Sequence, residues 1–236
     1  MKKIIKKLLL GKVSINVQPE YNHIQKRLHN IQSIWNNEHQ EDNGIEKIVR
    51  LLLASSQLLF PGIYLKYWAR KKGVEYQYLT LDCYILLKVI FPILILVNQW
   101  QNYQFVIWIL VYIFLETVFY IPTLIFASDL FSKPRSYKRS MLLLFFNYLE
   151  IAFAYAVFYS SGNFLNKSFN HWFDAVYFSI VTSSSVGYGD FFPVTLTGKV
   201  LVTTQALLFL FFIILFLNFF STKVKTKGYF DHENDQ

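Results

Sequence analysis

The feature that most constrains this chain is a series of four long apolar segments in its C-terminal two thirds, each almost free of charge. They lie at about residues 82–99, 105–128, 140–160 and 200–220. An α-helix rises about 1.5 Å per residue, so about 20 apolar residues cross a hydrocarbon core of about 30 Å. Each segment therefore predicts a membrane-spanning helix. Pro92 and Pro122 are expected to bend the first two, which neighbouring helices tolerate.

Composition supports a membrane protein and argues against several other classes. Of the 236 residues, 54% are apolar and 16% are charged, whereas about a quarter are charged in an average soluble domain. The formal net charge of +8 gathers in clusters between the apolar segments, which argues against a nucleic-acid partner and for a membrane topology. Cys83 is a single cysteine inside an apolar stretch, so no internal disulfide forms. No histidine or cysteine cluster has the spacing of a metal site, and we expect no enzyme.

The basic clusters set the expected topology. Residues 66–72, 133–139 and 223–227 fall on one side of a four-span chain, whereas the other side carries only Lys167 and Lys199. The positive-inside rule then places both termini in the cytoplasm. The expected divisions are a cytoplasmic arm over 1–79, two accessory spans within 80–138, a two-span domain over 139–222 and a short tail over 223–236.

The arm contains three amphipathic segments. Residues 1–12 are basic and apolar, and we interpret them as lying on the membrane surface. Residues 51–65 are apolar but short and broken by Pro61; we favour an interfacial helix, because a fifth span would move the arm's basic residues to the outer side. A heptad-like stripe predicts a helix face packed on its own protein, with self-association as the alternative. The stripe consists of Tyr21, Ile24, Leu28, Ile31 and Trp35.

The segment between the third and fourth apolar stretches is neither a span nor an ordinary loop. Residues 171–185 show helical spacing but are too short to cross, and they run into Val186-Gly187-Tyr188-Gly189. Alternate glycines admit backbone angles that are closed to other residues, so successive carbonyls can point to one side. Irregular backbone at membrane depth is tolerated only where protein buries it or it lines a wet cavity. Carbonyls facing a narrow axis can replace the water shell of a monovalent cation.

The stretch SVGYGD at residues 185–190 closely resembles the TVGYGD signature of the potassium-channel family, within the longer match WFDAVYFSIVTSSSVGYGDFFPVT. The resemblance covers about residues 139–222. It implies an all-α membrane protein with four transmembrane helices, a re-entrant pore helix and a filter loop, assembled as a homotetramer in the lipid bilayer. It implies passive K+ conduction by a multi-pass protein of the cell membrane. A non-conducting regulatory subunit and a weakly selective cation channel are the alternatives.

The resemblance also implies which residues form the filter. The family's filter positions correspond here to Ser185, Val186, Gly187, Tyr188 and Gly189. The carbonyls of the first four, with the Ser185 hydroxyl, would bind permeant K+, and no cofactor is expected. Ser185 replaces the family's usual threonine; it keeps the hydroxyl but loses the methyl group that fixes its rotamer, which would loosen the innermost site.

Further residues are expected to support this filter. Asp190 would accept a hydrogen bond from Tyr177, where family members often carry tryptophan. Phe209 stands at the position of the family's hinge glycine, and no Gly or Pro occurs from residue 199 to 227, so we expect no sharp bend there. Phe209, Ile213 and Phe216 either narrow the cavity or pack against the outer helix. Control is expected at the filter or through the arm.

Three ionisable residues lie inside the predicted spans: Lys88, Glu116 and Glu150. Such residues are costly in lipid and usually face protein or water. Lys88 would either extend toward the nearer interface or pair with Glu116, and we favour a structural ion pair over a gating role. A voltage sensor is disfavoured because no span has a series of basic residues. Asn166 begins a glycosylation sequon to which we give little weight.

Overall fold

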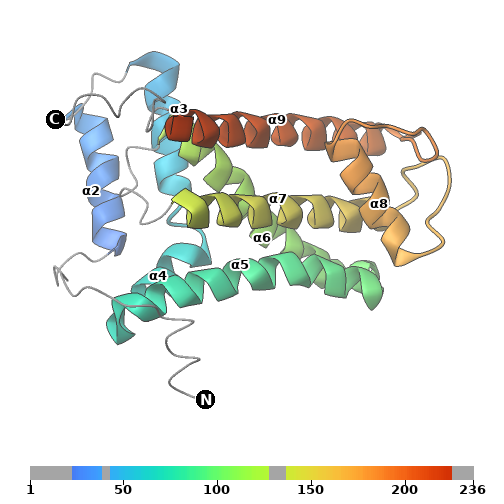
Figure 1. The fold of residues 1–236 in the computed structure, drawn as a ribbon, viewed down its shortest axis with the longest axis horizontal. Helices are drawn as coiled ribbons and strands as arrows, with labels where there is room; N and C mark the ends of the chain where they lie inside the picture. The colour runs from blue at the N-terminus through green and yellow to red at the C-terminus, as the bar shows by residue number, and fades with distance from the viewer. Residues whose placement is uncertain (1–22, 39–42, 128–136, 225–236) are drawn as a thin grey trace, which may run out of the picture. The chain divides into compact units, whose positions relative to one another are not determined.

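The computed structural model describes residues 23–38, 43–127 and 137–224 of the chain (Figure 1). These residues are helical apart from turns and loops, and no β-strand occurs among them beyond a single bridge between Leu165 and Pro193. The all-α prediction is therefore confirmed. The chain divides into two compact units, residues 1–132 (unit 1) and 133–236 (unit 2). Residues 1–12 and most of the tail lie outside the described residues.

Four described helices are long and apolar enough to cross a membrane, and a bent pair of shorter helices would make five if it is counted as one span. The four match the four segments expected from the sequence. They cover Tyr76–Val97, Gln104–Phe126, Lys138–Ser160 and Leu196–Asn218. The multi-pass membrane character of the chain follows from these helices.

Unit 1 contains helices α2 to α6 and one 3-10 turn. They are α2 (His23–Asn36), α3 (Gly44–Ser56), α4 (Pro61–Lys72), α5 (Val74–Val97), η1 (Trp100–Asn102) and α6 (Gln104–Phe126). Helix α5 begins well before the expected start at 82, so the arm boundary expected at residue 79 falls inside it. Pro92 and Pro122 both lie within continuous helices. Figure 1 shows α2 and α3 running across the direction of α5.

The segment expected as one interfacial helix over 51–65 is instead broken into α3 and α4, which are bent by 54°. The turn between them contacts the middle of α6: the Tyr112 hydroxyl donates to the Leu59 carbonyl at 2.7 Å, and the Gly62 amide donates to Glu116 Oε1 at 3.0 Å. Pro61 starts α4 because its fixed φ and missing amide proton suit the first helical turn. A Cβ at Gly62 would lie 2.6 Å from Glu116 Oε1, so glycine permits this approach.

Both flanks of this turn lie at the same end of unit 1. Ala54 packs with Ala127, which follows the last residue of α6, and α4 is joined to the start of α5 by Gly73 alone. Helix α3 therefore passes the end of α6, and the α3–α4 turn reaches the middle of α6. Helix α4 then returns along the first half of α5. The interfacial placement stays a prediction; the structure adds that the turn is held against the middle of α6, where Glu116 accepts from the Gly62 amide.

The heptad-like stripe of the arm falls on α2, apart from Tyr21, which lies outside the described residues. The prediction that this face packs on its own protein was wrong in part. Leu28 and Trp35 are exposed, and the buried apolar residue of α2 is Ile34, which packs with Ala54 and Ala127. Ile31 is partly buried against the same cluster. The spacing of apolar residues identified the helix but not the face that the rest of unit 1 covers.

Unit 2 consists of α7 (Tyr137–Ser160), α8 (Trp172–Ser183) and α9 (Leu196–Val224). The short α8 contacts both long helices, which also contact each other (Figure 1). Helix α9 runs for 29 residues without interruption, as the lack of Gly and Pro from residue 199 onward predicted. Thr195 caps its start, with the Gly198 amide donating to the Thr195 hydroxyl at 3.1 Å.

Candidate functional site

The start of α8 is held by a reciprocal cap. His171 Nδ1 accepts from the Phe173 amide at 3.2 Å, and the Asp174 carboxylate accepts from the amides of Asn170 and His171 at 3.0 and 2.9 Å. These bonds satisfy amides that have no partner within the helix, and the carboxylate suits the positive end of the helix dipole. The helix expected over 171–185 therefore begins at a defined residue, and its length brings the SVGYG stretch to its other end.

The end of α8 merges with the filter segment, which we define as residues 185–189. Ser185 takes φ +58°, its amide donates to the Thr182 carbonyl at 3.1 Å, and the Val186 amide donates to the Val181 carbonyl at 3.1 Å. A left-handed residue with these two bonds is a Schellman motif, the usual way to close a helix C-terminus. The amides of the first two filter residues therefore point back into α8.

The backbone of the filter segment alternates. Ser185, Gly187 and Gly189 have φ of +58°, +59° and +81°, whereas the two residues between them have negative φ. This alternation is the backbone that alternate glycines were expected to allow, in which successive carbonyls can point to one side. Among the described residues, none donates a hydrogen bond to a carbonyl oxygen of residues 185–189, and all five residues are exposed. A row of unused carbonyls therefore follows α8.

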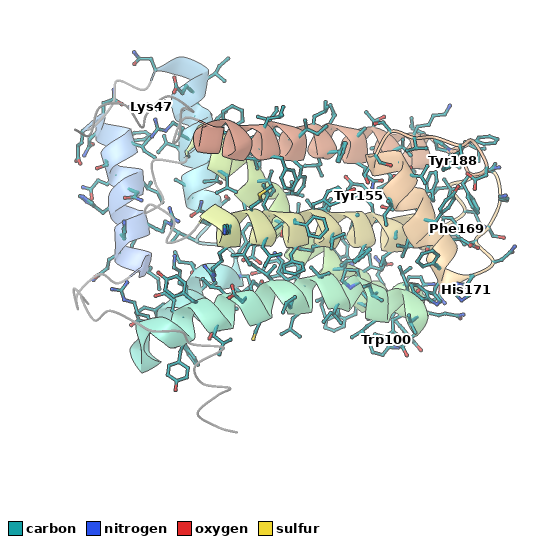
Figure 2. All side chains as sticks on the ribbon, viewed as in Figure 1. Lys47, Trp100, Tyr155, Phe169, His171 and Tyr188 are labelled. Carbon is teal, nitrogen blue, oxygen red and sulfur yellow. The ribbon has the colours of Figure 1, made fainter. Side chains whose placement is uncertain are left out.

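The structure brings Tyr177, Tyr188 and Asp190 together behind this row. The rings of Tyr177 and Tyr188 stack with centroids 6.4 Å apart and an interplanar angle of 4°. The Tyr177 hydroxyl donates a hydrogen bond to Asp190. Partial burial, followed by the charge of Asp190 and this bond, raises the pKa of Tyr177. Figure 2 shows Tyr188 among the loops at one end of unit 2, near Phe169 and His171.

The stretch after the filter segment is clamped by the loop after α7. The Asn166 side chain donates to the Asp190 carbonyl at 3.3 Å and accepts from the Phe192 amide at 3.0 Å. The Phe164 carbonyl accepts from the Val194 amide at 3.0 Å, and a Cβ at Gly198 would lie 2.7 Å from that carbonyl oxygen. The Asn166 amide thus has a structural use, which the sequon interpretation had not considered.

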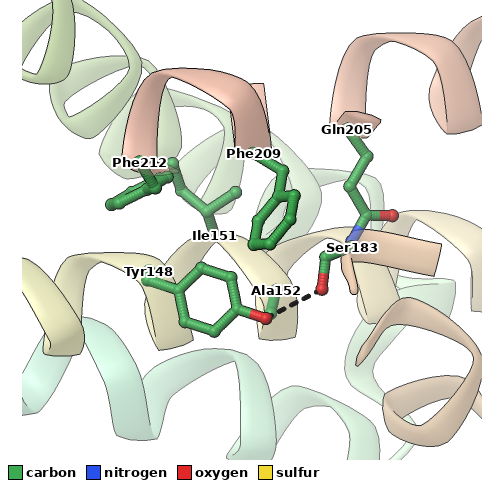
Figure 3. A pocket seen from close by; sticks show the side chains of 7 residues that line it. All are labelled: Tyr148, Ile151, Ala152, Ser183, Gln205, Phe209 and Phe212. Carbon is green, nitrogen blue, oxygen red and sulfur yellow. Dashed lines mark hydrogen bonds between the residues drawn. The ribbon is translucent and has the colours of Figure 1, made fainter. Parts of the chain in front are cut away.

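Phe209 packs against the outer helix α7, one of the two arrangements expected from the sequence. Its ring centroid lies 5.8 Å from that of Tyr148. A small pocket opens beside this contact (Figure 3). It is lined by Tyr148, Ile151, Ala152, Ser183, Gln205, Phe209 and Phe212. Ile213 is exposed and Phe216 is half-buried, so these two residues are not brought into this cluster.

Sequence reasoning missed a polar network that joins α7, α8 and α9. Gln205 Nε2 donates to the carbonyl and the hydroxyl of Ser179 at 2.9 and 2.8 Å, and Gln205 Oε1 accepts from the Tyr159 hydroxyl at 2.7 Å. The Ser179 hydroxyl donates to the Ala152 carbonyl. The signal was present: an uncharged polar residue in an apolar span still needs partners. Only the ionisable residues in the spans were considered.

The ion pair favoured from the sequence is present in unit 1. Lys88 Nζ lies 3.5 Å from Glu116 Oε2, and both side chains are largely buried. The Thr117 hydroxyl accepts from Lys88, and the Tyr84 hydroxyl donates to Glu116. The alternative in which Lys88 extends toward the interface is not the arrangement in the structure. Glu150 of α7 in unit 2 is buried, with 1% of its surface exposed.

Residues 143–226 match a family model described as an ion channel, and this part of the chain is therefore similar to that family. The match runs from within α7 to just beyond α9. Two long helices around a short helix and a glycine-rich loop are the arrangement of the potassium-channel family, to which the SVGYGD stretch pointed. Unit 1 lies outside the match. No solved structure matches the chain.

Proposed function

We propose that the chain is a subunit of a K+-selective channel that conducts passively through the filter segment. The observation that carries the proposal is a row of five exposed residues whose carbonyls accept from no described donor, on a backbone whose φ alternates in sign. Neutral carbonyl oxygens bind a weakly hydrated cation without holding it as tightly as a carboxylate would, which conduction requires. Ser185, Val186, Gly187 and Tyr188 would supply the K+ ligands.

Helix α8 adds an electrostatic contribution to this proposal. Its capped start lies at His171, and its C-terminal end runs directly into Ser185. The aligned peptide dipoles of a helix place a partial negative charge at that end. A cation beneath the innermost carbonyls is therefore favoured without any acidic side chain in its path.

One chain supplies only one wall of a carbonyl cage, so the proposal includes a homotetramer. Val186 and Tyr188 remain exposed in the single chain, as do apolar residues along α9. Those of α9 include Leu207, Leu210, Ile214 and Leu217. Neighbouring copies and lipid would cover these surfaces, and fourfold symmetry would close the row of carbonyls around an axis.

The proposed membrane placement follows from the helices and the basic clusters. With α5, α6, α7 and α9 as spans in a cell membrane and both termini cytoplasmic, the α3–α4 turn enters from the cytoplasmic side. Its contacts with Tyr112 and Glu116 would then lie near mid-depth, as in a re-entrant loop buried against protein. This placement keeps the arm's basic residues inside, in accord with the positive-inside rule.

The test is ion flux through the purified chain in liposomes. We expect K+ flux with little Na+ flux, and a reversal potential that follows the K+ gradient. Gly189→Asp should abolish selectivity or conduction, because it adds a side chain at φ +81° and a charge at the filter mouth. Assembly without any flux would favour the non-conducting subunit. Equal K+ and Na+ flux would favour the weakly selective channel.

A further inference from the structure

The packing of apolar helices does not require the hydrogen bonds that surround Gln205. Gln205 lies in the first half of α9, and its side chain is 1% exposed. A carboxamide has two donor hydrogens and an acceptor oxygen, and a buried one is costly unless these are used. Both kinds of group are used here, by Ser179 of α8 and Tyr159 of α7. The bonds therefore join Gln205 to two other helices.

The directions of these bonds assign the orientation of the amide. The Ser179 carbonyl can only accept, so the nitrogen of Gln205 must face it, and the Tyr159 hydroxyl then donates to the oxygen. The Ser179 hydroxyl completes the ring by donating to the Ala152 carbonyl of α7. An acceptor-only group of the same shape cannot make the same set of bonds.

The network holds α8 close to the filter segment. Ser179 lies six residues before Ser185, a rise of about 9 Å along a helix. One turn nearer the filter segment, Ser183 shares a hydrogen bond of 2.9 Å with the Tyr148 hydroxyl (Figure 3). Since the amides of Ser185 and Val186 bond to the last turn of α8, any shift of α8 along its axis moves the innermost carbonyls as well.

We infer that Gln205 is a positioning residue for the filter segment. It links the inner helix α9 to α8 and thereby sets the height of the innermost carbonyls, so that movement of α9 reaches the ion site without any hinge. This inference rests on the proposed K+ channel function and adds the residue through which α9 acts on the filter segment. Tyr159 orients the Gln205 amide by donating to its oxygen. Ser179 is the residue of α8 to which the amide nitrogen of Gln205 bonds.

The first experiment compares Gln205→Leu with Thr203→Val in the full chain, reconstituted in liposomes and planar bilayers. Thr203 is a matched control because it lies two residues away on α9, is exposed, and bonds only to the Lys199 carbonyl of its own helix. We expect Gln205→Leu to lower open probability or the K+/Na+ permeability ratio roughly tenfold, as loss of about one net hydrogen bond from a two-state equilibrium would. Thr203→Val should behave as wild type.

The second experiment uses Gln205→Glu, which keeps the acceptor for Tyr159. Its other oxygen faces the Ser179 carbonyl, and only the protonated acid can donate there. Open probability should therefore be low at alkaline pH and recover as pH falls, whereas the wild type should show no such recovery. A residue needed only for stability would give a lower melting temperature with no pH-dependent recovery of conduction.

Amide hydrogen exchange of residues 178–186 provides a readout that does not depend on conduction. We expect faster exchange in Gln205→Leu than in Thr203→Val. If wild type fails to select K+ but this difference persists, the proposed function fails and the positioning role stands. Unchanged exchange and open probability in assembled Gln205→Leu would overturn the inference. If Gln205→Leu does not assemble, Gln205→Glu decides: no recovery at low pH would overturn the inference.

Discussion

Both units of this chain bury polar groups among apolar helices, but they use different chemistry. Unit 1 buries an ion pair, Lys88 with Glu116, which also binds the Gly62 amide at the α3–α4 turn. In unit 2, the network that joins all three helices is neutral and centres on Gln205 and Ser179. Each network lies at the point where a short helix meets longer ones.

The difference has consequences for function. Removing one partner of a buried ion pair leaves an uncompensated charge, so unit 1 depends strongly on the charge state of two side chains. The neutral network of unit 2 adds no fixed charge behind the filter segment and does not titrate near neutral pH. The carbonyls of residues 185–189 and the dipole of α8 therefore act on a cation without a contribution from this network. Unit 1 is the part in which a change of charge would alter helix packing.

The largest expected effect is a difference between the two units when the same substitution, glycine to alanine, is made once in each. Gly187 and Gly44 both have φ +59°, and a Cβ at either would meet no atom within 4 Å. Alanine at either site should cost about 1–2 kcal/mol in a left-handed conformation. Only Gly187→Ala should lower the K+/Na+ permeability ratio, by at least about tenfold, because in the proposed tetramer it would distort four filter segments at once.

Gly44→Ala serves as the control for Gly187→Ala, with equal backbone strain in unit 1. Reversal potentials in K+/Na+ gradients measure both. Equal loss of selectivity in the two variants would contradict the assignment of conduction to unit 2.

The next effect concerns stability rather than selectivity. Glu116→Gln should destabilise the chain by roughly 3–5 kcal/mol, because Lys88 would remain charged and buried. Adding Lys88→Met to that change should recover most of the loss. Thermal melting of the purified chain measures both. Lys47→Met is the control: its ammonium bonds to the Trp35 carbonyl at 2.8 Å at a partly exposed site, and its removal should cost less than about 1 kcal/mol.

If the double variant of Lys88 and Glu116 were less stable than Glu116→Gln alone, loss of the ion pair would not explain the destabilisation. The comparison between a charged and a neutral network would then fail for unit 1.

A smaller effect is expected at the outer end of the filter segment. Tyr177→Phe removes the hydrogen bond to Asp190 and should speed the decay of K+ current during sustained opening several-fold. Because the pKa of Tyr177 is raised, its hydroxyl stays protonated at neutral and mildly alkaline pH. Wild-type decay should therefore be constant from pH 7 to 9 and speed up only above about pH 10.

The Phe variant should lack that alkaline transition, since it has no hydroxyl to lose a proton. Decay that accelerates in the wild type between pH 7 and 9 would mean that another group controls the outer filter.

The smallest expected effect is at the inner end of the filter segment. Ser185→Ala should weaken block by internal Ba2+ by a few-fold, because it removes one oxygen ligand per subunit while the left-handed backbone remains. Ser184→Ala is the neighbouring control, since its hydroxyl already donates to the Ile180 carbonyl of α8 at 2.8 Å. Equal changes in the two variants would show that the Ser185 hydroxyl does not face the ion.

Several features could be predicted because their causes are local. The length of each apolar segment decides whether a helix can cross a membrane, and the observed helices match. The glycines at 187 and 189 signalled the alternating backbone, because few other residues accept positive φ. The Lys88–Glu116 pair was also expected, since two opposite charges in adjacent spans have few other partners.

Other features could not be predicted because they depend on which helix faces meet. Leu28 and Trp35 have the spacing of a buried stripe, yet Ile34 is the buried apolar residue of α2. The α3–α4 turn reaches the middle of α6 because Glu116 accepts from Gly62, 54 residues away in the chain. Apolar periodicity describes one helix at a time and carries no information about such partners.

The sequence by itself therefore determined the membrane class, the helices and the filter segment, because hydrophobic length and glycine geometry act within a few residues. The tertiary structure alone decided how these parts are held in register: Gln205 with Ser179 and Tyr159 in unit 2, and Glu116 with Gly62 in unit 1. The physical reason is that a buried polar group must find partners wherever packing brings them, and in both units those partners lie on other helices.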